Sequence, residues 1–138
     1  MIDRTFVIVA IVAVAGIAAT VWWKKSNSGD GTASNMVIAI NIPELSVRAV
    51  KGRAAFEKNC SSCHGRNAVG SDQGPPLVHK IYEPNHHGDR AFLLAAANGV
   101  RSHHWSFGNM PRIEGVSQTE IASIVAYIRE LQRANGIF

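Results

Sequence analysis

The longest apolar stretch of the chain lies near its N-terminus. From Thr5 to Trp23, sixteen of nineteen residues are apolar and none is charged. As a helix this stretch would be about 28 Å long, close to the thickness of a membrane's hydrocarbon core. It ends in Trp22-Trp23, whose indole rings favour the membrane interface. The pattern predicts a single transmembrane anchor within residues 1–25.

Two other interpretations of this stretch fit less well. A cleavable signal peptide would begin with a more basic segment and have an apolar run of roughly 7–15 residues. This chain begins Met1-Ile2-Asp3-Arg4 and its apolar run is longer. A buried core helix is disfavoured because the run is uncharged throughout and ends in a tryptophan pair and two lysines.

Residues 26–45 have the composition of a linker between the anchor and the domain. Residues 26–35 read SNSGDGTASN, which is typical of a short flexible tether. Residues 36–43 place an isoleucine at every second position from Ile38 to Ile42 and end at a proline. This predicts an extended segment packed on its own domain, with docking onto a membrane partner as the alternative.

Helical signals begin at Ser46, which can cap a helix reaching about Asn59. Asp89 can cap a second helix, which would end at Asn98 before a glycine. The stretch between these helices is rich in proline and glycine and is expected to be mainly loop.

A capping box at residues 117–120 marks the start of the last predicted helix. Behind it the apolar residues recur with helical spacing, at Ile121, Ile124, Val125, Ile128 and Leu131. No segment between the helices has a strand pattern. The expected fold is therefore all-α, with one domain over residues 46–138 preceded by the anchor and the tether.

Composition limits what so small a domain can be. The chain has 138 residues, 46% of them apolar and 17% charged, which excludes a multidomain enzyme and a disordered tail. A body of about 90 residues is a candidate for an extra stabilising group such as a disulfide, a metal or a cofactor. Its two cysteines are too close in sequence to form a disulfide framework.

The net charge is modest and scattered. From Ser46 onward, 11 basic residues minus 7 acidic residues give +4. Such a surface can attract acidic docking sites on redox partners. Nucleic-acid binding is a poor explanation for so diffuse a charge, so no nucleic-acid partner is expected.

The cysteines belong to the motif Cys60-Ser61-Ser62-Cys63-His64, the C-x-x-C-H sequence that attaches haem c. On one helical turn both sulfurs can form thioethers with the haem vinyl groups, and the adjacent imidazole can bind the iron. A thioredoxin-like pair would need alternating strands and helices, and a zinc site would need further nearby ligands. Neither pattern is present, so one covalently attached haem c is predicted.

A second axial iron ligand must come from elsewhere in the body. Met110 is the only methionine after the haem motif, since Met1 and Met36 precede it. A thioether opposite histidine raises the reduction potential. Core packing is the other interpretation of this methionine. The rival ligands are His79, His86, His87, His103 and His104.

Several short motifs occur in an order that identifies a family resemblance: Gly52-x-x-x-Phe56-x-x-x-Cys60, Gly74-Pro75-Pro76-Leu77, Asn109-Met110-Pro111 and Ile124-x-x-Tyr127. With the C-x-x-C-H motif, they make residues 46–138 resemble a class I cytochrome c. The resemblance implies that the glycine lets the first and last helices cross closely and that Phe56 packs beside the haem. It places Tyr127 opposite them and implies that the Pro75 carbonyl accepts the ring N–H of the axial His64, which fixes its tautomer.

Trp105 has two interpretations under this resemblance. The family often places an aromatic N–H or O–H near a haem propionate, and Trp105 and Tyr82 are candidates. Burial of the ring against the haem is an equally good explanation.

The pairs His86-His87 and His103-His104 also suggest copper or zinc binding, because imidazole suits both metals. Adjacent residues seldom direct both rings at one metal, so exposed loop side chains or packing at the haem edge are favoured.

The resemblance implies electron transfer. We expect a membrane-tethered one-electron carrier, not an enzyme, passing electrons from a quinol-oxidising complex to a terminal oxidase or a photosynthetic reaction centre. A fixed cytochrome subunit of a larger membrane complex is the alternative, and a gas-sensing or peroxidatic protein is a third.

Two features predict opposite orientations in the membrane. Lys24 and Lys25 after the apolar run would by charge alone place the body in the cytoplasm. Haem attachment in the family takes place outside the cytoplasm. We therefore expect an inner-membrane protein with its haem domain on the periplasmic side.

Overall fold

The computed structural model describes residues 39–138, and within them the chain is helical. Its elements are α2 (Val47–Asn59), α3 (Ser61–His64), η1 (Arg66–Ala68), η2 (Lys80–Tyr82), α4 (Asp89–Asn98) and α5 (Gln118–Ala134). In this range the only strand-like pairing is an isolated bridge between Val100 and Met110. The helical fold expected for the domain is confirmed.

The predicted anchor over residues 5–23 lies outside the described residues. From residue 39 onward, none of the helices combines the length and the apolar character needed to cross a bilayer. The anchor therefore stays a prediction from the sequence.

The caps expected for the first and last helices are present. The Ser46 hydroxyl accepts a hydrogen bond from the backbone N–H of Ala49 at 3.2 Å, at the start of α2. At the start of α5, Ser117 and Glu120 form the complete capping box. The predicted apolar stripe of α5 is buried and supplies much of the core: Ile121, Ile124, Val125, Ile128 and Leu131.

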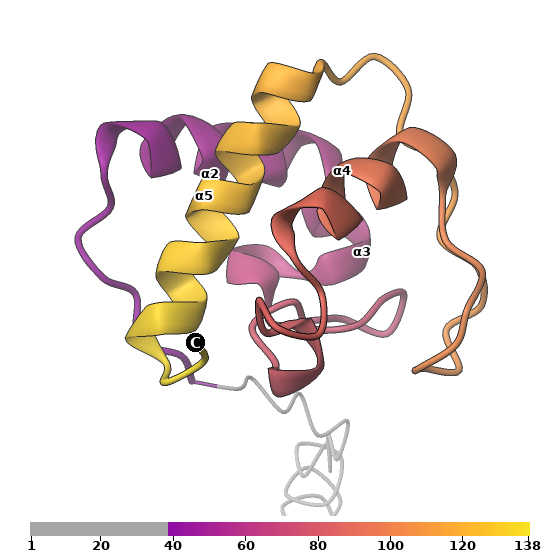
Figure 1. Cartoon of the computed structure of the whole chain (residues 1–138), viewed down its shortest axis with the longest axis horizontal. Helices are drawn as coiled ribbons and strands as arrows, with labels where there is room; N and C mark the ends of the chain where they lie inside the picture. The colour runs from indigo at the N-terminus through magenta and orange to yellow at the C-terminus, as the bar shows by residue number, and fades with distance from the viewer. Residues whose placement is uncertain (1–38) are drawn as a thin grey trace, which may run out of the picture. The chain divides into compact units, whose positions relative to one another are not determined.

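Helices α2 and α5 cross each other (Figure 1). Gly52 of α2 lies at the crossing, against Ser123 of α5. A Cβ atom at this position would overlap the backbone carbonyl of Ser123 on α5. Glycine is therefore required for the two backbones to approach so closely, as the family resemblance implied. Next to the crossing, the rings of Phe56 and Tyr127 pack with centroids 5.7 Å apart, and both side chains are fully buried.

We expect Gly52→Ala to lower the free energy of unfolding by about 2 kcal/mol. Overpacking costs up to about 3 kcal/mol, and alanine regains about 1 kcal/mol of helix propensity. Denaturant unfolding followed by far-ultraviolet circular dichroism would measure the change. Lys51→Ala, at the exposed neighbouring position of α2, is the control and should change stability by less than about 0.5 kcal/mol. Equal stabilities of the two variants would show that the crossing tolerates a side chain.

The start of α4 differs from the prediction. Asp89 is the first residue of the helix, and Gly88 occupies the N-cap without a side-chain hydrogen bond. The Asp89 carboxylate is instead engaged by Arg129 of α5, whose Nε donates to it at 2.8 Å. Its negative charge still lies in the first turn, where it interacts favourably with the helix dipole.

Arg129 and Gln132 of α5 fasten the segment that precedes α4. The buried guanidinium of Arg129 donates to the Tyr82 carbonyl at 2.7 Å and to the His87 carbonyl at 2.5 Å. It also donates to Gln132 Oε1 at 2.6 Å, and Gln132 Nε2 donates to the carbonyls of Leu77 and Tyr82 at 2.8 and 3.0 Å. Two side chains of α5 thus hold a loop that carries almost no regular structure of its own.

The described part of the predicted extended segment lies against the domain. Ile40 is half-buried against the core, whereas Ile42 is 44% exposed. The Asn41 backbone N–H donates to Asn135 Oδ1, and Asn135 Nδ2 donates back to the Asn41 carbonyl, each at 2.8 Å. From residue 39 the segment is therefore packed on its own domain, as expected.

Candidate functional site

The C-x-x-C-H motif forms a single helical turn. Cys60 caps α3, and its carbonyl accepts the backbone N–H groups of Cys63 at 3.2 Å and His64 at 3.0 Å. No disulfide joins the two cysteines; Cys60 is half-buried, and Cys63 is exposed. The turn therefore brings the two sulfurs and the imidazole onto one short segment, as the spacing predicted.

Burial keeps the Cys60 thiol protonated. Burial, with a smaller contribution from the neighbouring Cys63, raises the pKa of Cys60 to about 11. The reactive cysteine of a thioredoxin-like pair has the opposite property, a lowered pKa that yields thiolate near neutral pH. Cys60 therefore lacks the lowered pKa of the attacking cysteine in such a pair.

His64 is held for metal ligation through one nitrogen. Its Nδ1 lies 2.9 Å from the Pro75 carbonyl, which can only accept, so Nδ1 carries the proton and Nε2 is left for a metal. Burial lowers the pKa of His64, partly offset by this hydrogen bond, so the ring is held neutral. A neutral imidazole fixed by a carbonyl is the usual form of a histidine ligand.

The loop after His64 is closed by backbone in the left-handed region. Gly65 has φ of 71°, and a Cβ there would overlap the Gly70 carbonyl. Asn67 and Ala68 also have positive φ, at 55° and 60°. The Tyr127 hydroxyl donates to Asn67 Oδ1 at 3.2 Å and supports this conformation from α5. The loop returns the chain so that Pro75 faces His64.

His64 and Pro75, at the two ends of this loop, line a cavity of about 460 Å³. This volume is within the range of roughly 300–1,000 Å³ that is typical of cofactor sites. Of the predicted site residues, its walls include Phe56, Cys60, His64, Pro75, Trp105 and Met110. Tyr127 packs behind Phe56 and not in the wall, and Cys63 also lies outside the lining. Most of the expected site is thus brought together around one hollow.

Met110 lines this cavity and is held beside Val100, just after the C-terminal end of α4. Its backbone N–H donates to the Val100 carbonyl at 3.0 Å, and the Val100 N–H donates back at 2.9 Å. A Cβ at Gly99 would come within 2.6 Å of the Met110 carbonyl, so the turn that receives Met110 requires glycine. The methionine is therefore fixed in place by its backbone.

The rival histidines divide into two groups. His79 and His86 do not line the cavity, and His79 Nδ1 instead accepts the Ile81 backbone N–H at 3.2 Å, capping η2. His87, His103 and His104 do line it. The structure therefore narrows the candidates for a second iron ligand to Met110 and these three.

Trp105 presents an unused donor. Its ring packs edge-on against His79, with centroids 5.1 Å apart. Burial raises the pKa of the Tyr82 phenol, and Trp105 beside it partly offsets the rise. The two groups do not form a well-aligned hydrogen bond, so the buried indole N–H has no partner among residues 39–138. A buried donor of this kind needs an acceptor, and a haem propionate would supply one.

The polar residues that position this site were not anticipated. Arg129 and Gln132 lie among the apolar positions of α5, four residues after Val125 and Ile128 respectively. The sequence signal for both residues is a polar side chain on the otherwise apolar, buried face of an amphipathic helix. The sequence could therefore have marked both residues as buried and partnered, though not identified the loop carbonyls that they bind.

Taken together, the donor set fits haem c. The cavity is lined by apolar side chains, the Cys60 thiol is at its wall, and His64 offers a neutral Nε2. Met110 supplies a soft sulfur, and the Trp105 N–H is left for an acidic group.

Comparison with known proteins supports the same assignment. The family model described as Cytochrome c matches residues 49–132, which is more than half of the chain. The matched range runs from α2 to near the end of α5 and includes the C-x-x-C-H turn, the cavity and Met110. Searches of curated proteins and of solved structures returned no match. The chain belongs to the cytochrome c family, whose members bind haem c covalently and transfer electrons.

Proposed function

We propose that this protein is a membrane-tethered one-electron carrier. The observation that carries the proposal is the arrangement around His64, where the C-x-x-C turn, the Pro75 carbonyl and the cavity meet. When bound, haem c supplies an iron that gains and loses one electron. Electron transfer of this kind requires no general base or nucleophile from the protein.

Each site residue has a role in holding the cofactor. Cys60 and Cys63 would attach it through thioethers, and His64 would ligate the iron through Nε2. Met110 is the proposed second ligand because its backbone is fixed at the cavity and its thioether stabilises the reduced iron. Phe56 lines the wall with Tyr127 packed behind it, and the unpartnered Trp105 N–H would donate to a propionate.

We further propose that electrons arrive from a quinol-oxidising complex and leave to a terminal oxidase or a photosynthetic reaction centre. The apolar run of residues 5–23 supports an anchor in the inner membrane, with the haem domain on the periplasmic side. The composition of residues 26–35 predicts a flexible tether, whose r.m.s. span would be roughly 17 Å and would permit limited movement.

The anchor and its orientation are tested by expressing the full chain in a bacterial host that matures c-type cytochromes. We expect the haem protein to remain in the membrane fraction after a high-salt wash and to be digested when protease is added to spheroplasts. A matched chain with residues 1–25 replaced by a cleavable signal peptide should be released into the periplasm. Release of the full chain in soluble form, or its protection from protease, would contradict the proposal.

A fixed subunit of a larger complex is the second candidate, favoured by the shortness of the tether. Against it, the described part of the extended segment is engaged by its own domain through Asn41 and Asn135. Purification from the native membrane in mild detergent distinguishes the two. We expect the cytochrome to separate from its partners at high salt. A stoichiometric partner that survives salt would favour the subunit.

A further inference from the structure

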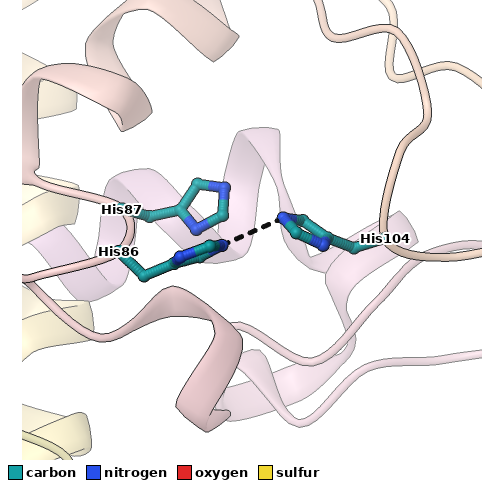
Figure 2. A group of neighbouring side chains, drawn as sticks. All are labelled: His86, His87 and His104. Carbon is teal, nitrogen blue, oxygen red and sulfur yellow. Dashed lines mark hydrogen bonds between the residues drawn. The ribbon is translucent and has the colours of Figure 1, made fainter.

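At one edge of the haem cavity, three imidazoles from two separate loops come together. His86 and His87 lie between η2 and α4, and His104 lies in the segment between α4 and α5. Figure 2 shows the rings of His86 and His104 facing each other, with the ring of His87 next to that of His86. One ring nitrogen from each lies within 4.8 Å of the others. Adjacent histidines seldom direct both rings at one metal, but in the fold His104 from a second loop joins the adjacent pair His86-His87.

The distances suit a metal ion. Nε2 of His86 and Nε2 of His104 are 3.2 Å apart. Two imidazole nitrogens bound to tetrahedral zinc at 2.0–2.1 Å would be separated by about 3.3 Å. His86 and His104 are exposed, so their rings can turn to shorten the wider distances to His87 without disturbing the core.

His87 carries the support that a ligand needs. Its Nδ1 lies 2.7 Å from the Ile81 carbonyl, so Nδ1 carries the proton and Nε2 remains available. Its own carbonyl accepts from Arg129, which fixes the backbone of the loop. A histidine ligand with its second nitrogen bound to a carbonyl is a recurring feature of metal sites. The positive charge of Arg129 is offset by Asp89.

The neighbouring His103 does not belong to the group. Its ring packs against His104, with centroids 4.2 Å apart, but its Nδ1 lies 2.9 Å from the Arg101 carbonyl and it is absent from the set that could share an ion. Exposure of the cluster leaves a fourth position to water. Three imidazoles and one open position match the ligand set of an open zinc site.

We propose that His86, His87 and His104 form a binding site for one divalent transition-metal ion, with Zn²⁺ as the best fit. Imidazole ligands favour zinc and copper over magnesium or calcium. This site is separate from the haem iron and goes beyond the electron-transfer function. It links the loop before α4 to the loop after it, so a bound ion would join two segments that both line the cavity.

The test is a titration of the full-length holoprotein, purified without a polyhistidine tag, with ZnCl₂ by calorimetry. We expect one Zn²⁺ per chain. Because removal of even an outer partner lowers metal affinity by about 10–100-fold, His86→Ala and His104→Ala should each weaken binding by at least about 100-fold. His103→Ala is the matched control and should retain the affinity.

Two results would overturn the proposal. One is zinc binding that is weak, non-stoichiometric or equally affected by His103→Ala, which would indicate adventitious surface binding. The other is loss of an iron ligand in His104→Ala, seen as a high-spin haem spectrum, which would show that this ring serves the iron. Lost zinc binding with an unchanged haem spectrum in His86→Ala, whose ring does not line the cavity, supports a distinct site.

Discussion

Replacing Met110 with histidine is expected to lower the reduction potential of the holoprotein by more than about 0.1 V, within the roughly 0.8 V range that axial ligands span. The reason is that an imidazole donates more strongly than a thioether and so favours the oxidised iron. Haem should stay attached, because Cys60, Cys63 and His64 are unchanged. Spectroelectrochemical titration of the purified variant measures the shift.

The absorption spectrum provides an independent readout. The oxidised wild-type protein should show the weak sulfur-to-iron charge-transfer band, and Met110→His should lack it. Met36→His is the matched control, since Met36 precedes the domain and should leave both band and potential unchanged. If the wild-type protein lacks the band and Met110→His leaves the potential unaltered, the ligand must be sought among His87, His103 and His104, which also line the cavity.

Arg129→Met is expected to lower the free energy of unfolding by about 3 kcal/mol. The guanidinium is 6% exposed and donates to the carbonyls of Tyr82 and His87 and to Asp89. Leaving a buried carbonyl without its donor costs about 1–3 kcal/mol. The Asp89 carboxylate is 69% exposed and regains water, so it adds little to this loss.

Denaturant unfolding followed by circular dichroism and by haem absorption would measure this effect. Arg133→Ala, one turn later on the exposed face of α5, is the control and should change stability by less than about 0.5 kcal/mol. Because Arg129 also fixes the His87 backbone, Arg129→Met should weaken zinc binding as well. Equal stability of the two variants would show that the loop is held by other contacts.

The helices could be predicted because their signals are local. Ser46 and the Ser117–Glu120 capping box lie next to the turns that they stabilise. The apolar residues from Ile121 to Leu131 recur with helical spacing, so the sequence itself indicates which face of α5 is buried. Gly52 was recognisable only through the family resemblance, since nothing in its neighbourhood reveals that Ser123 lies against it.

The start of α4 shows where local reasoning fails. Asp89 has the side chain of an N-cap, but Arg129, forty residues later, engages it. Similarly, Arg129 and Gln132 bind backbone carbonyls, which carry no sequence signature.

The histidine pairs show the same limit for the site. Considered within each pair, neighbouring rings diverge, and a metal site is a poor explanation. In the fold, His86 and His104 face each other across two loops that α5 and the Val100–Met110 bridge hold in place. Such a group depends on tertiary structure, so its members were visible in the sequence but their assembly was not.

The central claim is that Cys60 and Cys63 hold one haem covalently beside His64. The most direct test is to extract the purified protein with acidified organic solvent and to record the pyridine haemochrome spectrum of the precipitated protein. We predict that the haem stays with the polypeptide, at one per chain, with the spectrum of a haem whose two vinyl groups are both saturated. Haem that passes into the organic phase, or a spectrum with unsaturated vinyl groups, would contradict the account.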